Sequence, residues 1–333
     1  MVRSVLAVLL SLVALNAIGG GLYGVLGAKG LPREWLAGGP FRDYSIPSAF
    51  LLLGVGGTFG AAAIAVFRGA RHARALSVTA GLLALGWIAI QVALMGLRSF
   101  LQPVIFVAGV AVLGLAAALP GAPVRDYLGL YIGTALRPRR TFESLLRHPA
   151  SLSFGLLALA GNALLYTVVY AFLVFGGGRP TVFAPWLAID PEEYYRWNVV
   201  FVAPSMGLSF VAAAAVGQLV ARALGGTGSF ENTVAVLGFG TAIASWTTLL
   251  HDLVTSCLGA VHVLDQRAYE DALSSTGPLG RAFTGVMVAY LVAFVALFTK
   301  GLAVAHALPR PRATASGVVA FVVYQAVFVV FNR

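Results

Sequence analysis

Long apolar segments alternate with short polar ones along the whole chain. The apolar segments are about 18 residues or longer, the length that an α-helix needs to cross a bilayer. Nearly all charged residues lie in the connections. The pattern predicts an all-α, polytopic integral membrane protein with about nine spanning helices. We expect these helices at residues 5–28, 46–67, 75–97, 103–119, 152–174, 197–221, 233–261, 282–305 and 314–331.

The composition agrees with this class. Hydrophobic residues make up 59% of the 333 and charged residues only 10%, whereas soluble domains carry roughly 25% charged residues. The single Cys257 excludes an intramolecular disulfide and a cysteine metal cluster. The chain has no Gly-Lys-Ser/Thr, HExxH or GxSxG motif. We therefore expect a protein that is not an enzyme and that uses no cofactor or metal.

A more polar stretch divides the spans into groups of four and five. Residues 1–120 are predicted to form a four-helix transmembrane domain and residues 150–333 a five-helix one, joined by a basic cytoplasmic linker at 121–149. Within the linker, Phe142, Leu145 and Leu146 alternate with basic residues at helical spacing. This spacing predicts an amphipathic helix that lies at the membrane interface.

The formal charge of +10 is spread over many short connections. It forms no aromatic-studded basic stripe, so nucleic acid is not an expected partner. Anionic lipid headgroups explain the charge better. Protein partners and a homo-oligomer stay open. The side chains expected to meet headgroups are Arg137, Arg139, Arg140 and Arg147.

The basic residues also indicate an orientation. With the amino terminus in the cytoplasm, the two densest clusters, Arg68 to Arg74 and Arg137 to Arg147, both fall inside. Arg outnumbers Lys by 20 to 2, and Gly and Ala are abundant, which is typical of GC-rich coding. We expect a bacterial inner-membrane protein.

The second half carries three sequence features of a known family. They are Tyr194-Tyr195-Arg196-Trp197 with Pro204 in the same span, the turn from Leu224 to Glu231, and the closing stretch with Tyr324-Gln325 and Phe331-Asn332-Arg333. In these features residues 125–333 resemble the Yip (Ypt-interacting protein) domain family. The resemblance implies a cytoplasmic segment followed by five spanning helices. It implies the fold more than an activity, because bacterial members are mostly uncharacterised.

The first half carries a separate resemblance. Its features are the segments 31–38, 41–47, 87–91 and 99–103. In them residues 1–120 resemble a group of small four-helix bacterial inner-membrane proteins of unknown function. This resemblance implies no chemistry. Gln91, Arg98 and Gln102 are expected to gather at the outer end of this domain, either as a small pocket or as polar caps.

One spanning helix has a polar face with ionisable side chains. Ser245, Thr248, Asp252 and Thr255 follow one another at spacings of three and four residues, and His251 precedes Asp252. Residues at these spacings share one face of a helix. An ionisable side chain within a span is costly and marks a candidate functional site. These five residues form the candidate intramembrane polar site.

Two interpretations of this face remain. Asp252 and His251 could form a proton or ion site, or the face could hold helices together by hydrogen bonds. Lys300 is expected to extend to the cytoplasmic interface and not to pair with Asp252. His262 and His306, near span ends, are expected at the interface, and Gly56 and Gly60 are expected in close helix packing.

The favoured function follows from the second interpretation. It is a non-enzymatic membrane-organising or scaffold protein of Yip-like type. The alternative is a transporter or proton-coupled permease that uses the Asp252 and His251 face.

Overall fold

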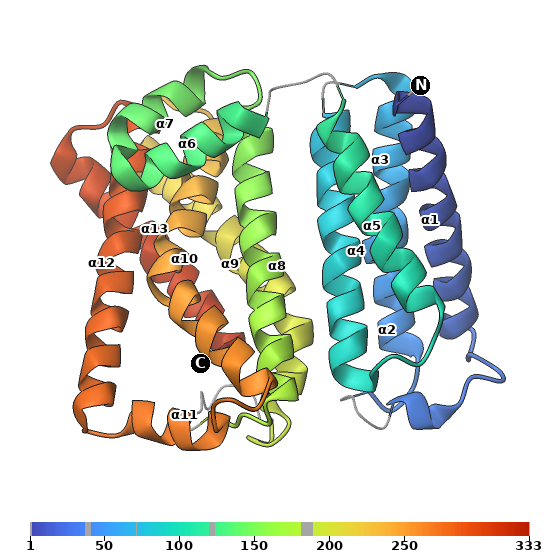
Figure 1. The fold of residues 1–333 in the computed structure, drawn as a ribbon. Helices are drawn as coiled ribbons and strands as arrows, with labels where there is room; N and C mark the ends of the chain where they lie inside the picture. The colour runs from blue at the N-terminus through green and yellow to red at the C-terminus, as the bar shows by residue number, and fades with distance from the viewer. Residues whose placement is uncertain (1, 37–40, 71, 120–123, 181–188, 333) are drawn as a thin grey trace. The chain divides into compact units, whose positions relative to one another are not determined.

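The computed structural model describes residues 2–36, 41–70, 72–119, 124–180 and 189–332. Within these ranges the chain is helical and has no strand (Figure 1). It divides into two compact units, Met1–Gly121 and Ala122–Arg333. Each unit is described by itself.

Unit 1 contains four long apolar helical stretches. The second of them includes a π-helical turn, which widens the helix locally without interrupting it. The elements of unit 1 are α1 (Val2–Val25), η1 (Arg33–Leu36), α2 (Ser45–Phe50), η2 (Leu51–Gly56), α3 (Gly57–Arg68), α4 (Ala73–Met95) and α5 (Leu101–Ala117).

Unit 2 contains five long helices and three short ones. The short helices lie across the ends of the long ones (Figure 1). The elements of unit 2 are α6 (Val124–Leu136), α7 (Pro138–Arg147), α8 (Ser151–Phe175), α9 (Tyr194–Ala223), α10 (Phe230–Ala260), α11 (Gln266–Ser274), α12 (Pro278–His306) and α13 (Arg310–Phe331).

The apolar pattern predicted the long helices well. Every expected span matches a helical stretch, and their ends agree within four residues. Eight stretches of the described chain are long and apolar enough to cross a membrane. The ninth, α5, is a shorter apolar helix of 17 residues, at the lower limit of about 17 for a span. The all-α, polytopic membrane fold is confirmed, with eight full-length spans and one short apolar helix.

Glycines allow close packing between α1 and the second span of unit 1. A Cβ atom on Gly24 would overlap the Ser48 hydroxyl, and one on Gly21 would lie 2.6 Å from the Leu52 Cβ. Gly56 makes a similar approach, because its Cβ would lie 2.8 Å from the Ile18 side chain. Gly60 has open space around it. The expected packing role is therefore right for Gly56 and wrong for Gly60.

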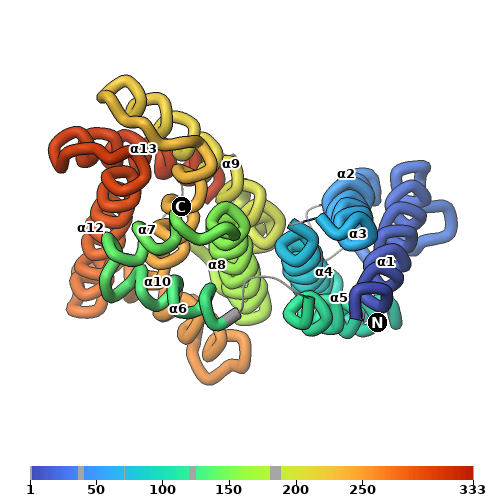
Figure 2. The backbone as a smooth tube through the Cα atoms, turned by 90° about the horizontal axis from the view of Figure 1, so that it is seen from above, coloured from blue at the N-terminus to red at the C-terminus, as the bar shows by residue number. Residues whose placement is uncertain are grey.

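Helix α10 is the central helix of unit 2. Of its apolar 18-residue stretch 78% is buried, compared with 22–44% in the other spans. It packs against α8, α12 and α9 and against the short helices α6 and α7 (Figure 2). A polar face on this helix therefore lies inside the protein.

The segment expected to be a linker folds as part of unit 2. It forms two helices, α6 and α7, where one was expected. Phe142 and Leu145 of α7 are fully buried and belong to the same core as Val236 and Phe298. Their apolar face packs on the core of unit 2. The predicted amphipathic helix is present as α7, and its position at a membrane interface stays a prediction.

The two ends of unit 2 differ in their elements. At one end α6 and α7 lie beside the α9–α10 and α12–α13 turns, and Thr227 donates its backbone N–H to the His306 carbonyl there. At the other end α11 lies beside the α8–α9 connection (Figure 1). Arg267 of α11 donates to the Gly177 carbonyl at 2.8 Å. We call these the α7 end and the α11 end.

Candidate functional site

Helix α10 carries the candidate polar face. Ser229 precedes its first residue and caps it, because the Ser229 hydroxyl accepts the backbone N–H of Asn232. Ser245 and Thr248 are buried one helical turn apart. Because α10 is surrounded by other helices, their hydroxyls need partners within the protein.

These partners come from α8. The Asn162 side-chain amide donates to the Ser245 hydroxyl at 3.0 Å, and the Tyr166 and Thr248 hydroxyls share a hydrogen bond of 3.2 Å. Both partners lie about one helical turn apart on α8, the spacing that matches Ser245 and Thr248. The inner half of the candidate site is therefore an interhelical contact between α8 and α10. Asn162 and Tyr166 are single polar residues of an apolar span, and no sequence pattern identifies them as these partners.

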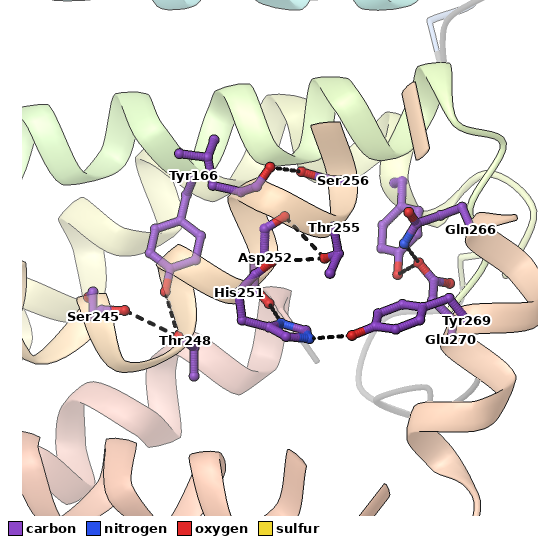
Figure 3. A network of polar contacts seen from close by, with 12 residues as sticks. Tyr166, Ser245, Thr248, His251, Asp252, Thr255, Ser256, Gln266, Tyr269 and Glu270 are labelled. Atoms are coloured by element: carbon purple, nitrogen blue, oxygen red, sulfur yellow. Dashed lines mark hydrogen bonds and ion pairs between the residues drawn. The ribbon is translucent and has the colours of Figure 1, made fainter. Parts of the chain in front are cut away.

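The outer half of the site is a chain of three side chains that reaches α11 (Figure 3). His251 Nδ1 lies 2.9 Å from an Asp252 carboxylate oxygen, and His251 Nε2 lies 2.9 Å from the Tyr269 hydroxyl. Thr255 donates its hydroxyl to the His251 backbone carbonyl. The structure thus joins His251 to Asp252, as their order in the sequence indicates, and adds Tyr269.

This chain can accept His251 in either protonation state. Burial and the nearby Asp252 raise the pKa of Tyr269, so its hydroxyl keeps its proton near neutral pH. With neutral His251, the Tyr269 O–H donates to Nε2 and the Nδ1–H donates to Asp252. With protonated His251, both ring N–H groups donate, the Tyr269 oxygen accepts, and Asp252 gains an ion pair. No hydrogen bond is lost in either state.

The His251–Asp252 pair is only partly enclosed. Their side chains are 25% and 30% exposed, and the Phe283 ring of α12 lies 5.2 Å from the His251 ring centre. Lys300 is elsewhere, in a surface hollow at the α7 end. The expectation that Lys300 does not pair with Asp252 agrees with this arrangement.

A second polar cluster at the α11 end was not anticipated. Glu270 of α11 is only 4% exposed. One of its carboxylate oxygens accepts from the Tyr195 hydroxyl at 2.9 Å and from the Gln266 amide at 3.0 Å. The other accepts the Arg179 backbone N–H at 3.0 Å. Glu270 thereby fastens α11 to α9 and to the α8–α9 connection. Nothing in the local sequence distinguishes Glu270 from the exposed acid Asp271.

His306 differs from its expected interfacial position. Its side chain is buried, and its Nε2 lies 2.8 Å from the Thr233 hydroxyl. Thr233 also donates to the Gln218 side-chain oxygen. The glycines of the α9–α10 turn explain the burial, because a Cβ on Gly228 would lie 2.1 Å from the Ala305 carbonyl oxygen. The turn closes directly over the end of α12 and covers His306. His262 is exposed.

The polar residues of unit 1 act as a helix cap. The Gln102 side-chain oxygen accepts the backbone N–H groups of Arg98 and Ser99, and its amide donates to the Gly96 carbonyl. Gln102 therefore satisfies backbone groups at the turn before α5. Of the two readings of this cluster, the polar cap fits. In the described part of the chain, no group of three or more His, Cys, Asp or Glu side chains could hold a metal ion.

The sequence features of the second half have structural roles in unit 2. Tyr195 binds Glu270, as described above. Gln325 donates its amide to the Tyr290 hydroxyl at 2.8 Å, and Asn332 donates to the Ser205 hydroxyl at 2.7 Å. These bonds join α13 to α12 and to α9. The features therefore mark contacts between helices of one bundle.

Comparison with known proteins agrees with this bundle. A family model described as the Yip1 domain matches residues 132–331, more than half of the chain and entirely within unit 2. No curated protein and no solved structure gives a significant match. The resemblance noted for residues 1–120 stays a prediction. With its residues 132–331 matched, this integral membrane protein belongs to the Yip1 domain family.

Proposed function

We propose that this chain is a non-enzymatic scaffold that organises the membrane around it through lipid and helix contacts. The observation that carries the proposal is that side chains of neighbouring helices bind the polar face of α10. Two residues of α8 bind Ser245 and Thr248, and Tyr269 of α11 binds His251. In a bilayer such bonds hold helices together, at about 0.6 to 2 kcal/mol each.

We further propose a bacterial inner membrane with the amino terminus and the α7 end of unit 2 in the cytoplasm. The support is the charge distribution: the α7 end carries the Arg137 to Arg147 cluster, and the α11 end carries Glu192, Glu193, Asp265 and Asp271.

Reporter fusions test this orientation. Because basic clusters remain in the cytoplasm, fusions after Arg74 and Arg140 should report cytoplasm. Fusions near Asp190 and Tyr269 should report the outside. A fusion at Tyr269 that reports the same side as one at Arg140 would contradict the orientation and the number of spans in unit 2.

One observation favours the second candidate, a proton-coupled permease. Asp252 and His251 are partly exposed, and the His251 ring keeps both hydrogen bonds whether it is neutral or protonated. Hydrogen bonds that persist in both forms are what a proton-conducting side chain requires. The inner half of the face, at Ser245 and Thr248, is buried against α8.

Substitutions of Asp252 separate a structural role from a titrating one. Asp252→Asn keeps a side-chain oxygen that accepts the His251 Nδ1–H, so we expect an unchanged melting temperature in detergent. Asp252→Leu removes the acceptor and should cost about 0.6 to 2 kcal/mol. Equal melting of the Leu variant and the wild type would show that the Asp252 carboxylate does not help to hold His251 against Tyr269 of α11.

A further inference from the structure

Lys300 and the start of α7 lie together although 160 residues separate them in the sequence. Gly301, next to Lys300, lies against the Phe142 ring, which a Cβ at this position would contact at 3.6 Å, and against Val236, which the Cβ would crowd at 3.1 Å. Phe142 is fully buried one turn after the start of α7. The packing of Phe142 on α12 therefore holds Lys300 beside the first turn of α7.

A surface hollow of about 430 Å³ lies between these two elements. Its described lining contains four cationic side chains, one proline and no carboxylate: Arg137, Pro138, Arg139, Arg140 and Lys300. Arg139 also lies 3.3 Å from Glu143, but with 77% of its side chain exposed this pair is weak. The hollow is a site of concentrated positive charge.

The backbone adds to this charge. The hollow contains the amino terminus of α7, a helix of ten residues with Pro138 in its first turn. The backbone N–H groups of a first helical turn have no partner within the helix, and the helix dipole is positive there. Pro138 has no N–H, and the Thr141 N–H donates to the Arg137 carbonyl at 3.1 Å. The N–H groups of Arg139 and Arg140 are therefore the ones that face a ligand. A phosphate group is the ligand that accepts hydrogen bonds from such N–H groups and from guanidinium groups together.

The position of Lys300 on α12 places the hollow near the end of a span. Lys300 lies within the span Pro278–His306, less than two turns before its end. A lysine at such a position extends toward the headgroup layer. Arg147 lies at the far end of α7, about 13 Å away along the helix axis, and does not line the hollow.

We propose that this hollow is a binding site for a phosphate group, formed by the first turn of α7 and Lys300. The group can belong to an anionic phospholipid or to a soluble phosphate. The site is distant from Asp252, and it does not depend on whether the protein is a scaffold or a permease.

The test is lipid binding by the full chain, measured by native mass spectrometry. Detergent-purified protein is titrated with phosphatidylglycerol, with phosphatidylcholine and with inorganic phosphate. The pocket variant is Arg137→Gln, Arg140→Gln and Lys300→Gln together. The control variant, Arg125→Gln, Arg222→Gln and Arg310→Gln, removes the same charge from exposed positions outside the hollow. All six side chains are exposed, so both variants should fold, which melting curves check.

We expect the pocket variant to lose phosphatidylglycerol affinity by about tenfold or more, because each basic side chain beside the phosphate adds to the binding free energy. The control variant should lose much less, because its three side chains do not line the hollow. A version of the pocket variant that carries Lys300→Arg in place of Lys300→Gln should recover part of the phosphatidylglycerol affinity, because it regains one of the three charges. Loss confined to phosphatidylglycerol supports the site with a lipid source, and an equal loss of inorganic phosphate binding supports it with a soluble source. Equal losses in the pocket and control variants would overturn the site, because total charge would then explain the binding.

Discussion

Replacing Gly155 of α8 by alanine is expected to destabilise unit 2. The new Cβ would lie 2.6 Å from the Ala235 Cα and 2.9 Å from its carbonyl oxygen. Both are backbone atoms of α10, so no side-chain rotation can relieve the clash. Overpacking of this kind costs about 1 to 3 kcal/mol. Melting of the detergent-purified protein should fall by several degrees.

Gly161 provides the matched control on the same helix. Its Cβ would meet nothing within 4 Å, and alanine is a better helix former than glycine by about 1 kcal/mol. Gly161→Ala should therefore melt at the wild-type temperature or above. Equal melting temperatures of the two variants would contradict the close contact between α8 and α10. They would also contradict the position of α10 at the centre of unit 2.

Glu270→Ala is expected to have the second large effect. It removes the acceptor for the Tyr195 hydroxyl, the Gln266 amide and the Arg179 backbone N–H. Hydrogen bonds to a charged group contribute about 1.5 to 3 kcal/mol each, and donors left buried without a partner add their desolvation cost. We expect a loss of about 3 kcal/mol or more. Cleavage of the α11 segment should also speed up in limited proteolysis.

Asp271→Ala is the control, because Asp271 is the next residue and is exposed. It removes the same charge and should change neither melting nor cleavage of α11. The melting temperature of a Glu270→Gln variant should lie between those of Glu270→Ala and the wild type, since glutamine keeps one acceptor oxygen and the shape of the side chain. Equal behaviour of the Glu270→Ala and Asp271→Ala variants would show that α11 is held by other contacts.

The sequence predicted the parts of the fold that depend on the solvent around each helix. An apolar run of bilayer length is stable only as a helix in lipid, so the nine runs appear as helical stretches near their expected ends. The α7 helix was expected from its spacing too, but not its burial. Phe142 and Leu145 meet Val236 and Phe298, and such a contact cannot be deduced from α7 alone.

The candidate site could likewise be predicted only in part from the sequence. The polar residues of α10 were recognisable because they repeat with the helical period. Their partners were not, because Asn162, Tyr166 and Tyr269 are single polar residues with no pattern of their own. Glu270 and His306 were missed or misplaced for a similar reason. Their burial depends on turns and helix ends that come together only in the folded bundle.

Proton flux into proteoliposomes tests the scaffold proposal most directly. Wild type and Asp252→Asn are reconstituted at equal amounts, a pH gradient is applied, and an internal pH-sensitive dye is followed. If the Asp252–His251–Tyr269 chain only holds α10 to α11, both proteins should show the flux of empty liposomes. A flux in the wild type that Asp252→Asn abolishes, while the variant melts at the wild-type temperature, would contradict the scaffold proposal and support a permease.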